Sequence, residues 1–97
     1  MSQRLGKSMG RSYVLVETQP GKEKESYEAI SALKRISRID FVHGSYDFVV
    51  ILEGEIRDMD YTVMDIRKAP YVRKTETLLC FEAFSWEDLS GRLHEEP

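Results

Sequence analysis

The chain has 97 residues, which suits one domain that buries about two thirds of its unfolded surface. Apolar residues make up 41% and charged residues 32%, a composition typical of a globular domain and not of a disordered segment. The net charge of −3 gives no general attraction to phosphate backbones, so we expect no direct contact with nucleic acid. Neither a membrane span nor a signal peptide is recognisable, so we expect no membrane association and a cytoplasmic location.

The first third of the chain predicts a strand and a helix. Residues 1–10 are polar and aperiodic, which indicates a flexible N-terminal tail. Residues 11–18 are rich in β-branched and aromatic side chains, and Pro20 and Gly21 end the strand that they predict. Within residues 21–34, a stripe of apolar side chains among charged ones predicts one face of an amphipathic helix: Tyr27, Ile30 and Leu33.

Two strands and a second helix follow. Residues 36–43 alternate in polarity, which predicts a half-buried strand with Ile39, Phe41 and His43 on one side. Residues 48–52 are apolar on both faces, so this strand is central in the sheet or lies against a second subunit. A second amphipathic helix is predicted by four apolar residues at helical spacing: Ile56, Met59, Val63 and Ile66.

Basic residues end this helix and a last strand follows it. Arg67 and Lys68 complement the dipole of the helix, and Pro70 closes it. Residues 71–84 predict the fourth strand, and Ser85 caps a short helical segment in a C-terminal extension.

The predicted order is β-α-β-β-α-β, spanning residues 11–84 and followed by the extension at 85–97. This order is typical of the α+β, ferredoxin-like fold, a four-stranded antiparallel sheet with two helices on one face. Because the strand at 48–52 is apolar on both sides, the face of the sheet opposite the two helices must also be buried against something. A second copy of the chain supplies it most simply, so we expect a dimer that packs sheet to sheet, of the dimeric α/β barrel type.

The connection between the second and third strands carries the most informative chemistry. Gly44 and Ser45 offer backbone N–H groups to an anion, Asp47 accepts from an ammonium group, and Tyr46 both donates and accepts. These are the groups that hold an amino-acid zwitterion. The alternative interpretation is structural: Gly44 supplies a positive φ, and Asp47 bonds only local backbone.

Catalytic and metal-binding residues are sparse. Cys80 is a lone cysteine in an apolar run and indicates a small packed residue, while His43 is the one histidine in the predicted fold and His94 lies near the end of the chain. We therefore expect no metal, no cofactor and no enzyme activity. A small dimeric ferredoxin-like enzyme with a pocket between sheet and helices is the alternative. An RNA-recognition fold and an ACT-type domain share parts of the pattern but fit its motifs less well.

Three motifs in order resemble the ligand-binding domain of the Lrp/AsnC (feast/famine) regulators, also called the RAM domain. They are Pro-Gly after the first strand, Val-His-Gly-Ser-Tyr-Asp at 42–47, and Val-Arg-Lys-Thr-Glu-Thr at 72–77. The resemblance covers about residues 11–82 and implies dimers, ring-like assemblies such as octamers, and amino-acid effectors bound between dimers near the Gly-x-Tyr-Asp turn.

The same resemblance implies the site residues and the partners. Its ligand-binding candidates are Gly44, Ser45, Tyr46, Asp47, Thr75 and Thr77. The first strand begins near Arg11, which leaves no room for the helix-turn-helix domain of full-length regulators. We therefore expect a stand-alone module that modulates transcription indirectly, through a full-length Lrp/AsnC regulator. By residue type alone, β propensity is the favoured explanation of the two threonines.

Overall fold

The computed structural model describes residues 9–80 and confirms the predicted order and the ferredoxin-like fold. The tail up to residue 8, the expected strand residues beyond Cys80, and the C-terminal extension with its helix start at Ser85 lie outside the described residues. The elements are β1 Met9–Thr18, α1 Glu23–Ser31, β2 Ile36–Phe41, β3 Phe48–Glu55, α2 Ile56–Arg67 and β4 Val72–Cys80.

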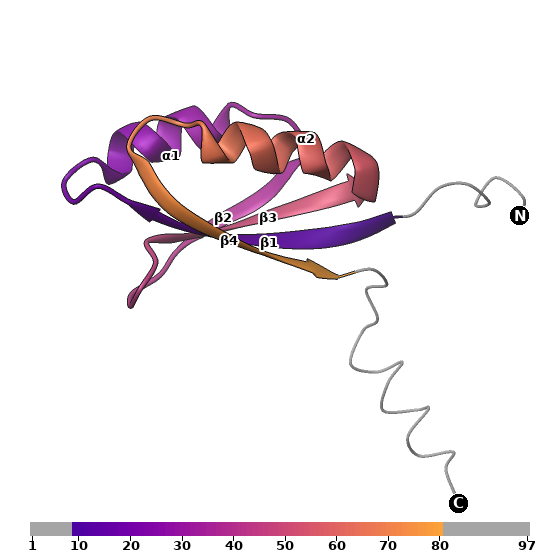
Figure 1. Ribbon diagram of the computed structural model, residues 1–97, viewed down its shortest axis with the longest axis horizontal. Helices are drawn as coiled ribbons and strands as arrows, with labels where there is room; N and C mark the ends of the chain where they lie inside the picture. The colour runs from indigo at the N-terminus through magenta and orange to yellow at the C-terminus, as the bar shows by residue number, and fades with distance from the viewer. Residues whose placement is uncertain (1–8, 81–97) are drawn as a thin grey trace, which may run out of the picture.

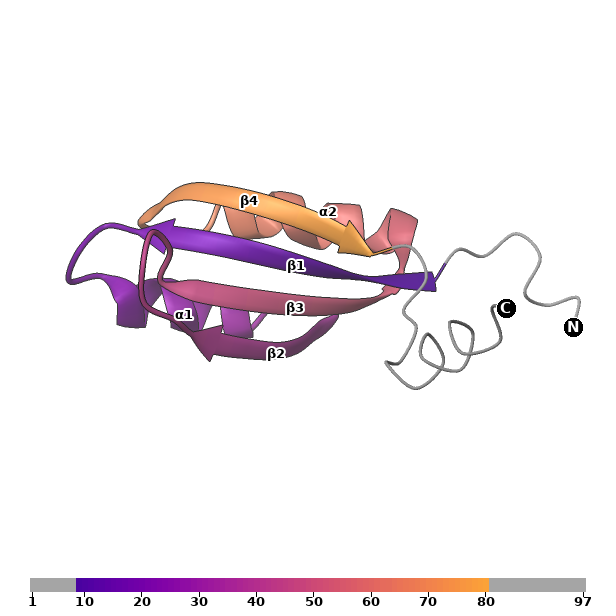
Figure 2. The same ribbon diagram turned by 90° about the horizontal axis from the view of Figure 1, so that it is seen from below.

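The four strands form one antiparallel sheet in the order β2-β3-β1-β4 (Figure 2). Both helices cover the same face of this sheet (Figure 1). β1 pairs with β3 from Met9 opposite Glu55 to Val16 opposite Phe48, so β3 is central, as its apolar run predicts. β1 begins at Met9, two residues before the predicted Arg11, because its ladder with β3 continues that far.

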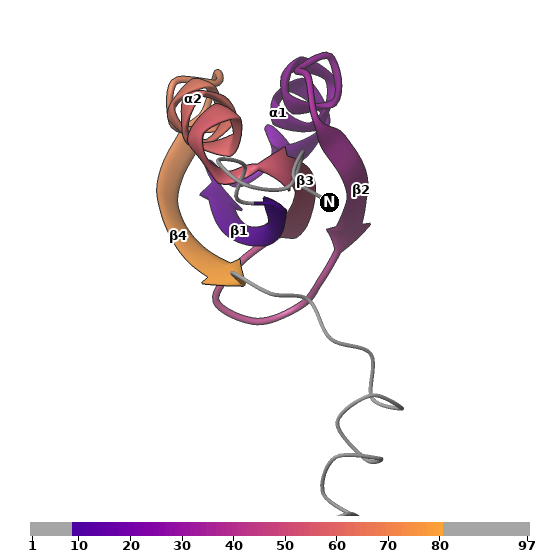
Figure 3. The ribbon, with the colours of Figure 1, turned by 90° about the vertical axis from the view of Figure 1, so that its right-hand side faces the viewer.

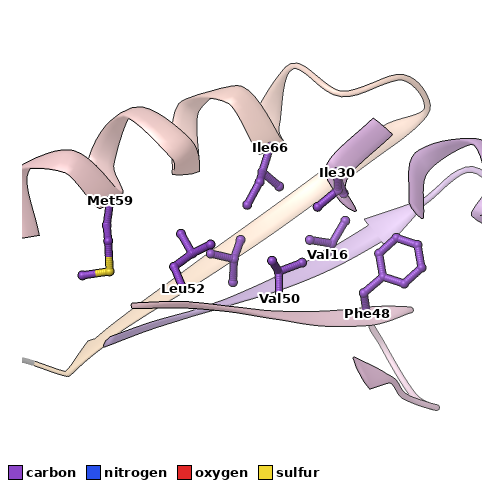
Figure 4. Packing of buried hydrophobic residues seen from close by; sticks show 8 residues of the cluster. Val16, Ile30, Phe48, Val50, Leu52, Met59 and Ile66 are labelled. Atoms are coloured by element: carbon purple, nitrogen blue, oxygen red, sulfur yellow. The ribbon is translucent and has the colours of Figure 1, made fainter. Parts of the chain in front are cut away.

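The register divides the side chains between the two faces. Val14 lies opposite Val50 in β3 and Thr77 in β4, so these three residues share the face beneath the helices. Along β1 every second residue from Ser12 to Thr18 is buried, which is the period expected of a strand with one covered face. Side chains of β1, β3, α1 and α2 converge in one core (Figure 4): Val14, Val16, Ile30, Phe48, Val50, Leu52, Met59 and Ile66.

Within residues 9–80, no helix lies over the other face of the sheet, here called the open face. Viewed end-on, the sheet curves so that its edge strands bend away from the helices, and the loop between β2 and β3 lies on the open side (Figure 3). By register, the open face carries five apolar or aromatic side chains that are half-buried or exposed: Tyr13, Leu15, Val49, Ile51 and Leu78. This confirms the prediction that β3 is apolar on both faces.

Strand β2 differs in detail from its prediction. It ends at Phe41, so His43 belongs to the following loop and not to the apolar side of the strand. A register shift between Ile36 and Arg38 inserts an extra residue. Ile36 therefore lies opposite Leu52 and on the same face as Ile39, although simple alternation would place them on different faces.

Each helix hydrogen-bonds to the loop that leaves the other helix. The hydroxyl of Ser26 in α1 donates to the Pro70 carbonyl at 2.6 Å, and that of Thr62 in α2 donates to the Lys34 carbonyl at 3.3 Å. Both side chains are buried. The residues after these carbonyls, Arg35 and Tyr71, have left-handed φ angles of 69° and 65°. The two hydrogen bonds therefore stabilise a strained backbone conformation just before β2 and just before β4.

Candidate functional site

The loop of residues 42–47 is the predicted functional turn. The Val42 N–H donates to the Asp47 carbonyl at 3.0 Å and closes the loop. Gly44 has a φ of +124°, and a Cβ at this position would meet nothing within 4 Å. Glycine is therefore required here by the backbone conformation and not by lack of space. The prediction that Gly44 supplies a positive φ is confirmed.

Asp47 ties the loop to the end of β1. Its Oδ2 accepts hydrogen bonds from the Thr18 backbone N–H at 2.8 Å and from the Thr18 hydroxyl at 3.1 Å. The Asp47 N–H in turn donates to the Val16 carbonyl at 2.8 Å. Asp47 thus bonds a strand 29 residues away in sequence, which neither interpretation of the sequence predicts.

Tyr46 crosses from the loop to β4. Its hydroxyl donates to Glu76 Oε1 at 2.9 Å, and the Lys74 ammonium lies 5.8 Å from the centre of its ring. Lys74 lies opposite Glu17 and Glu76 opposite Leu15, so both belong to the open face. The hydrogen bond to Glu76 raises the pKa of the Tyr46 phenol, and desolvation and the charges of Glu76 and Glu17 add to this effect.

The two threonines lie on the other side of the sheet. Thr75 is opposite Val16 and Thr77 is opposite Val14, so both lie on the helix-covered face, and Thr75 is half-buried. Tyr46 reaches β4 from the open face. Within one chain, therefore, the loop and the two threonines do not converge on a common cavity.

The tip of the loop keeps free backbone donors. Gly44 and Ser45 are exposed, and within residues 9–80 no acceptor pairs with their N–H groups. His43 is also exposed. The arrangement combines a loop fixed at its base by Asp47 with unpaired donors at its tip, which suits the binding of a carboxylate.

Proteins of known structure share this fold. No family model and no curated protein matches the chain. The crystal structure of FFRP-DM1 is 30% identical and has a TM-score of 0.67, with 73% of this chain and 97% of that chain aligned. The chain belongs to the Lrp/AsnC (feast/famine) family.

Two further structures share the fold. TTHA0845 from Thermus thermophilus is 28% identical with a TM-score of 0.71, over 78% of this chain and 98% of that one. Escherichia coli AsnC, at 14% identity and a TM-score of 0.69, shares the fold over 86% of this chain. The alignment spans 57% of AsnC. The Lrp/AsnC-family chain thus matches the whole of short relatives and about half of a longer one.

A cavity of about 320 Å³ lies where α2 meets the start of β4. In this Lrp/AsnC-family chain it is lined by Arg67, Val72, Arg73, Lys74 and Thr75. Thr75 is the one predicted site residue among them. Sequence reasoning assigns Arg67 to the helix dipole and misses Arg73 and Lys74 as ligand-binding candidates, although the local density of basic residues is a usable signal.

Across residues 9–80, no group of three or more His, Cys, Asp or Glu side chains is placed to hold a metal ion. No helix within the same range is long and apolar enough to cross a membrane.

Proposed function

We propose that this chain is an effector-binding and oligomerisation module that binds an amino acid or a related small molecule at the 42–47 loop. The observation that carries the proposal is the Asp47–Thr18 anchor, which fixes the loop by its base while the N–H groups of Gly44 and Ser45 stay unpaired within residues 9–80. A carboxylate accepts from such donors, and the Tyr46 oxygen is an acceptor within the same loop for an ammonium group.

Self-association completes this proposal. The open face presents an apolar surface that the described residues 9–80 leave uncovered, centred on Tyr13, Leu15 and Ile51. Burying it against the same face of a second copy gives a symmetric dimer. Since Thr75 and Thr77 lie on the opposite side of the sheet from Tyr46, they meet a ligand at the loop only if another copy supplies them. This favours a site between dimers in a higher, ring-like assembly.

Regulation of transcription is then indirect. The fold is that of regulatory proteins such as AsnC. The net charge of −3 argues against direct DNA contact by this chain, so co-assembly with a full-length Lrp/AsnC regulator is the proposed route.

A thermal-shift screen of the common amino acids tests the proposal. A ligand at about 100 times its dissociation constant stabilises the folded state by about 2.7 kcal/mol, and each kcal/mol raises the melting temperature of a domain this size by about 4–8 °C. At least one amino acid should therefore raise the melting temperature by about 10 °C. If no amino acid shifts it at millimolar concentration, the proposed function is wrong.

A further inference from the structure

The cavity between α2 and β4 is strongly basic although the chain as a whole is acidic. Three of its five lining residues, Arg67, Arg73 and Lys74, carry a positive charge, while the net charge of the chain is −3. They come from two elements, since Arg67 ends α2 and the other two lie in β4. Basic residues of both elements therefore line a space of about 320 Å³, which is of the size that holds small molecules.

No carboxylate of the described residues neutralises these cations. Within residues 9–80, none of the three makes an ion pair within 4 Å. Glu17 lies opposite Lys74 in the ladder without such a contact, and Glu76 accepts its hydrogen bond from Tyr46. Basic residues without an ion-pair partner attract an anion, so a carboxylate that enters the cavity is stabilised there.

The local backbone brings Arg73 to the cavity. Lys74 pairs with Glu17 and Val72 pairs with Thr18, so Arg73 is an extra residue in a register shift of β4. Bulges of this kind redirect a side chain, and β4 is an edge strand paired only with β1 among the described strands. A guanidinium group matches the planar, two-oxygen geometry of a carboxylate better than a point charge does.

We propose that this cavity binds the side-chain carboxylate of an acidic effector, of the dicarboxylic amino-acid class. The inference rests on the proposed function, because Thr75 belongs to both the cavity and the predicted ligand-binding set. Lys74 joins the cavity to the loop, since its ammonium lies against the ring of Tyr46. Because the loop and Thr75 lie on opposite sides of the sheet in one chain, a molecule with a carboxylate at each end satisfies the loop donors of one copy and the basic cavity of another. A neutral amino acid satisfies only the loop.

Calorimetric titration with L-glutamate and L-aspartate, each compared with its neutral amide, L-glutamine or L-asparagine, tests this at constant ionic strength. Wild type should bind one of the acids at least about 10-fold more tightly than its amide, since a hydrogen bond to a charged group contributes about that factor. Arg73→Gln and Arg67→Gln should each remove most of this preference. Lys68→Gln is the matched control, because it removes the same charge at the end of α2 from a residue that does not line the cavity.

The outcomes separate the inference from the proposed function. Equal binding of each acid and its amide, or an equal loss in Lys68→Gln and Arg73→Gln, overturns the inference, and the basic residues then serve only the helix dipole. If a neutral amino acid still stabilises the fold in that case, the proposed function stands without the inference. Inorganic phosphate that binds with the same dependence on Arg73, while both acids fail, shows an anion site of a different class and also overturns it.

Discussion

The carboxylate of Asp47 accepts two hydrogen bonds from Thr18, one from its backbone N–H at 2.8 Å and one from its hydroxyl at 3.1 Å. Thr18 is the last residue of β1 and is 3% exposed. The conformation of the 42–47 loop is thus set by its hydrogen bonds to the end of β1 and not by the loop alone. A substitution at Asp47 or Thr18 is expected to lower both the stability of the fold and the affinity for a ligand, but to different extents.

Asp47→Ala should lower the free energy of unfolding by about 1.5–3 kcal/mol, because it leaves the buried Thr18 donors without an acceptor. Thr18→Val removes only the hydroxyl and keeps the backbone bond, so it should cost less, about 0.5–1.5 kcal/mol. Urea unfolding monitored by circular dichroism measures both. No loss of stability in Asp47→Ala would show that the anchor does not form in solution.

The phenol of Tyr46 should titrate above the ordinary tyrosine pKa of about 10. The folded state holds the protonated phenol on Glu76, so this contribution to stability is complete below the unfolded pKa and is lost as pH rises through the folded one. Ultraviolet difference titration of wild type against Tyr46→Phe isolates this group. Glu76→Gln should lower its pKa toward the ordinary value, and an unchanged pKa would contradict the bond.

The hydrogen bonds from Ser26 to Pro70 and from Thr62 to Lys34, which join each helix to the loop after the other helix, are testable separately. Ser26→Ala should destabilise the fold by about 0.5–1.5 kcal/mol, because it removes the 2.6 Å hydrogen bond from the buried Ser26 hydroxyl to the Pro70 carbonyl. Thr62→Val removes a longer bond, at 3.3 Å, and should cost less. Thermal unfolding compares the two variants with Ser31→Ala, an exposed control in α1. A Ser26 variant as stable as this control would be contrary to the expectation.

The two faces of β3 should respond differently to charge. Ile51 lies on the open face, so Ile51→Glu should give a folded chain that no longer self-associates, because the charge would be buried at the interface. Val50 is fully buried beneath the helices, so Val50→Glu should unfold the chain. Sedimentation velocity and circular dichroism distinguish these results. A wild-type protein that stays an 11.3 kDa monomer at micromolar concentration would refute the assembly.

Pattern and turn chemistry are sufficient to predict the order of elements, both helices and the central position of β3. They cannot predict the bulge near Ile36, because a register shift depends on the partner strand. Ser26 lies outside the apolar stripe that predicts the buried face of its helix, and its burial depends on the distant Pro70 carbonyl. The partner of Asp47 is likewise missed because Thr18 is 29 residues away, and a single sequence carries no distances.

Calorimetric titration of the effector found in the screen, with wild type, Asp47→Ala and Thr18→Val, tests the central claim most directly. The account predicts that Asp47→Ala weakens binding by about 10-fold or more, whereas Thr18→Val stays within a few-fold of wild type because its backbone bond holds the loop. Sedimentation of the same samples should show assembly changing with ligand, as linkage requires of a site between copies. Equal affinities for wild type and Asp47→Ala, with the oligomer intact, would place the ligand elsewhere and leave the 42–47 loop a structural hairpin.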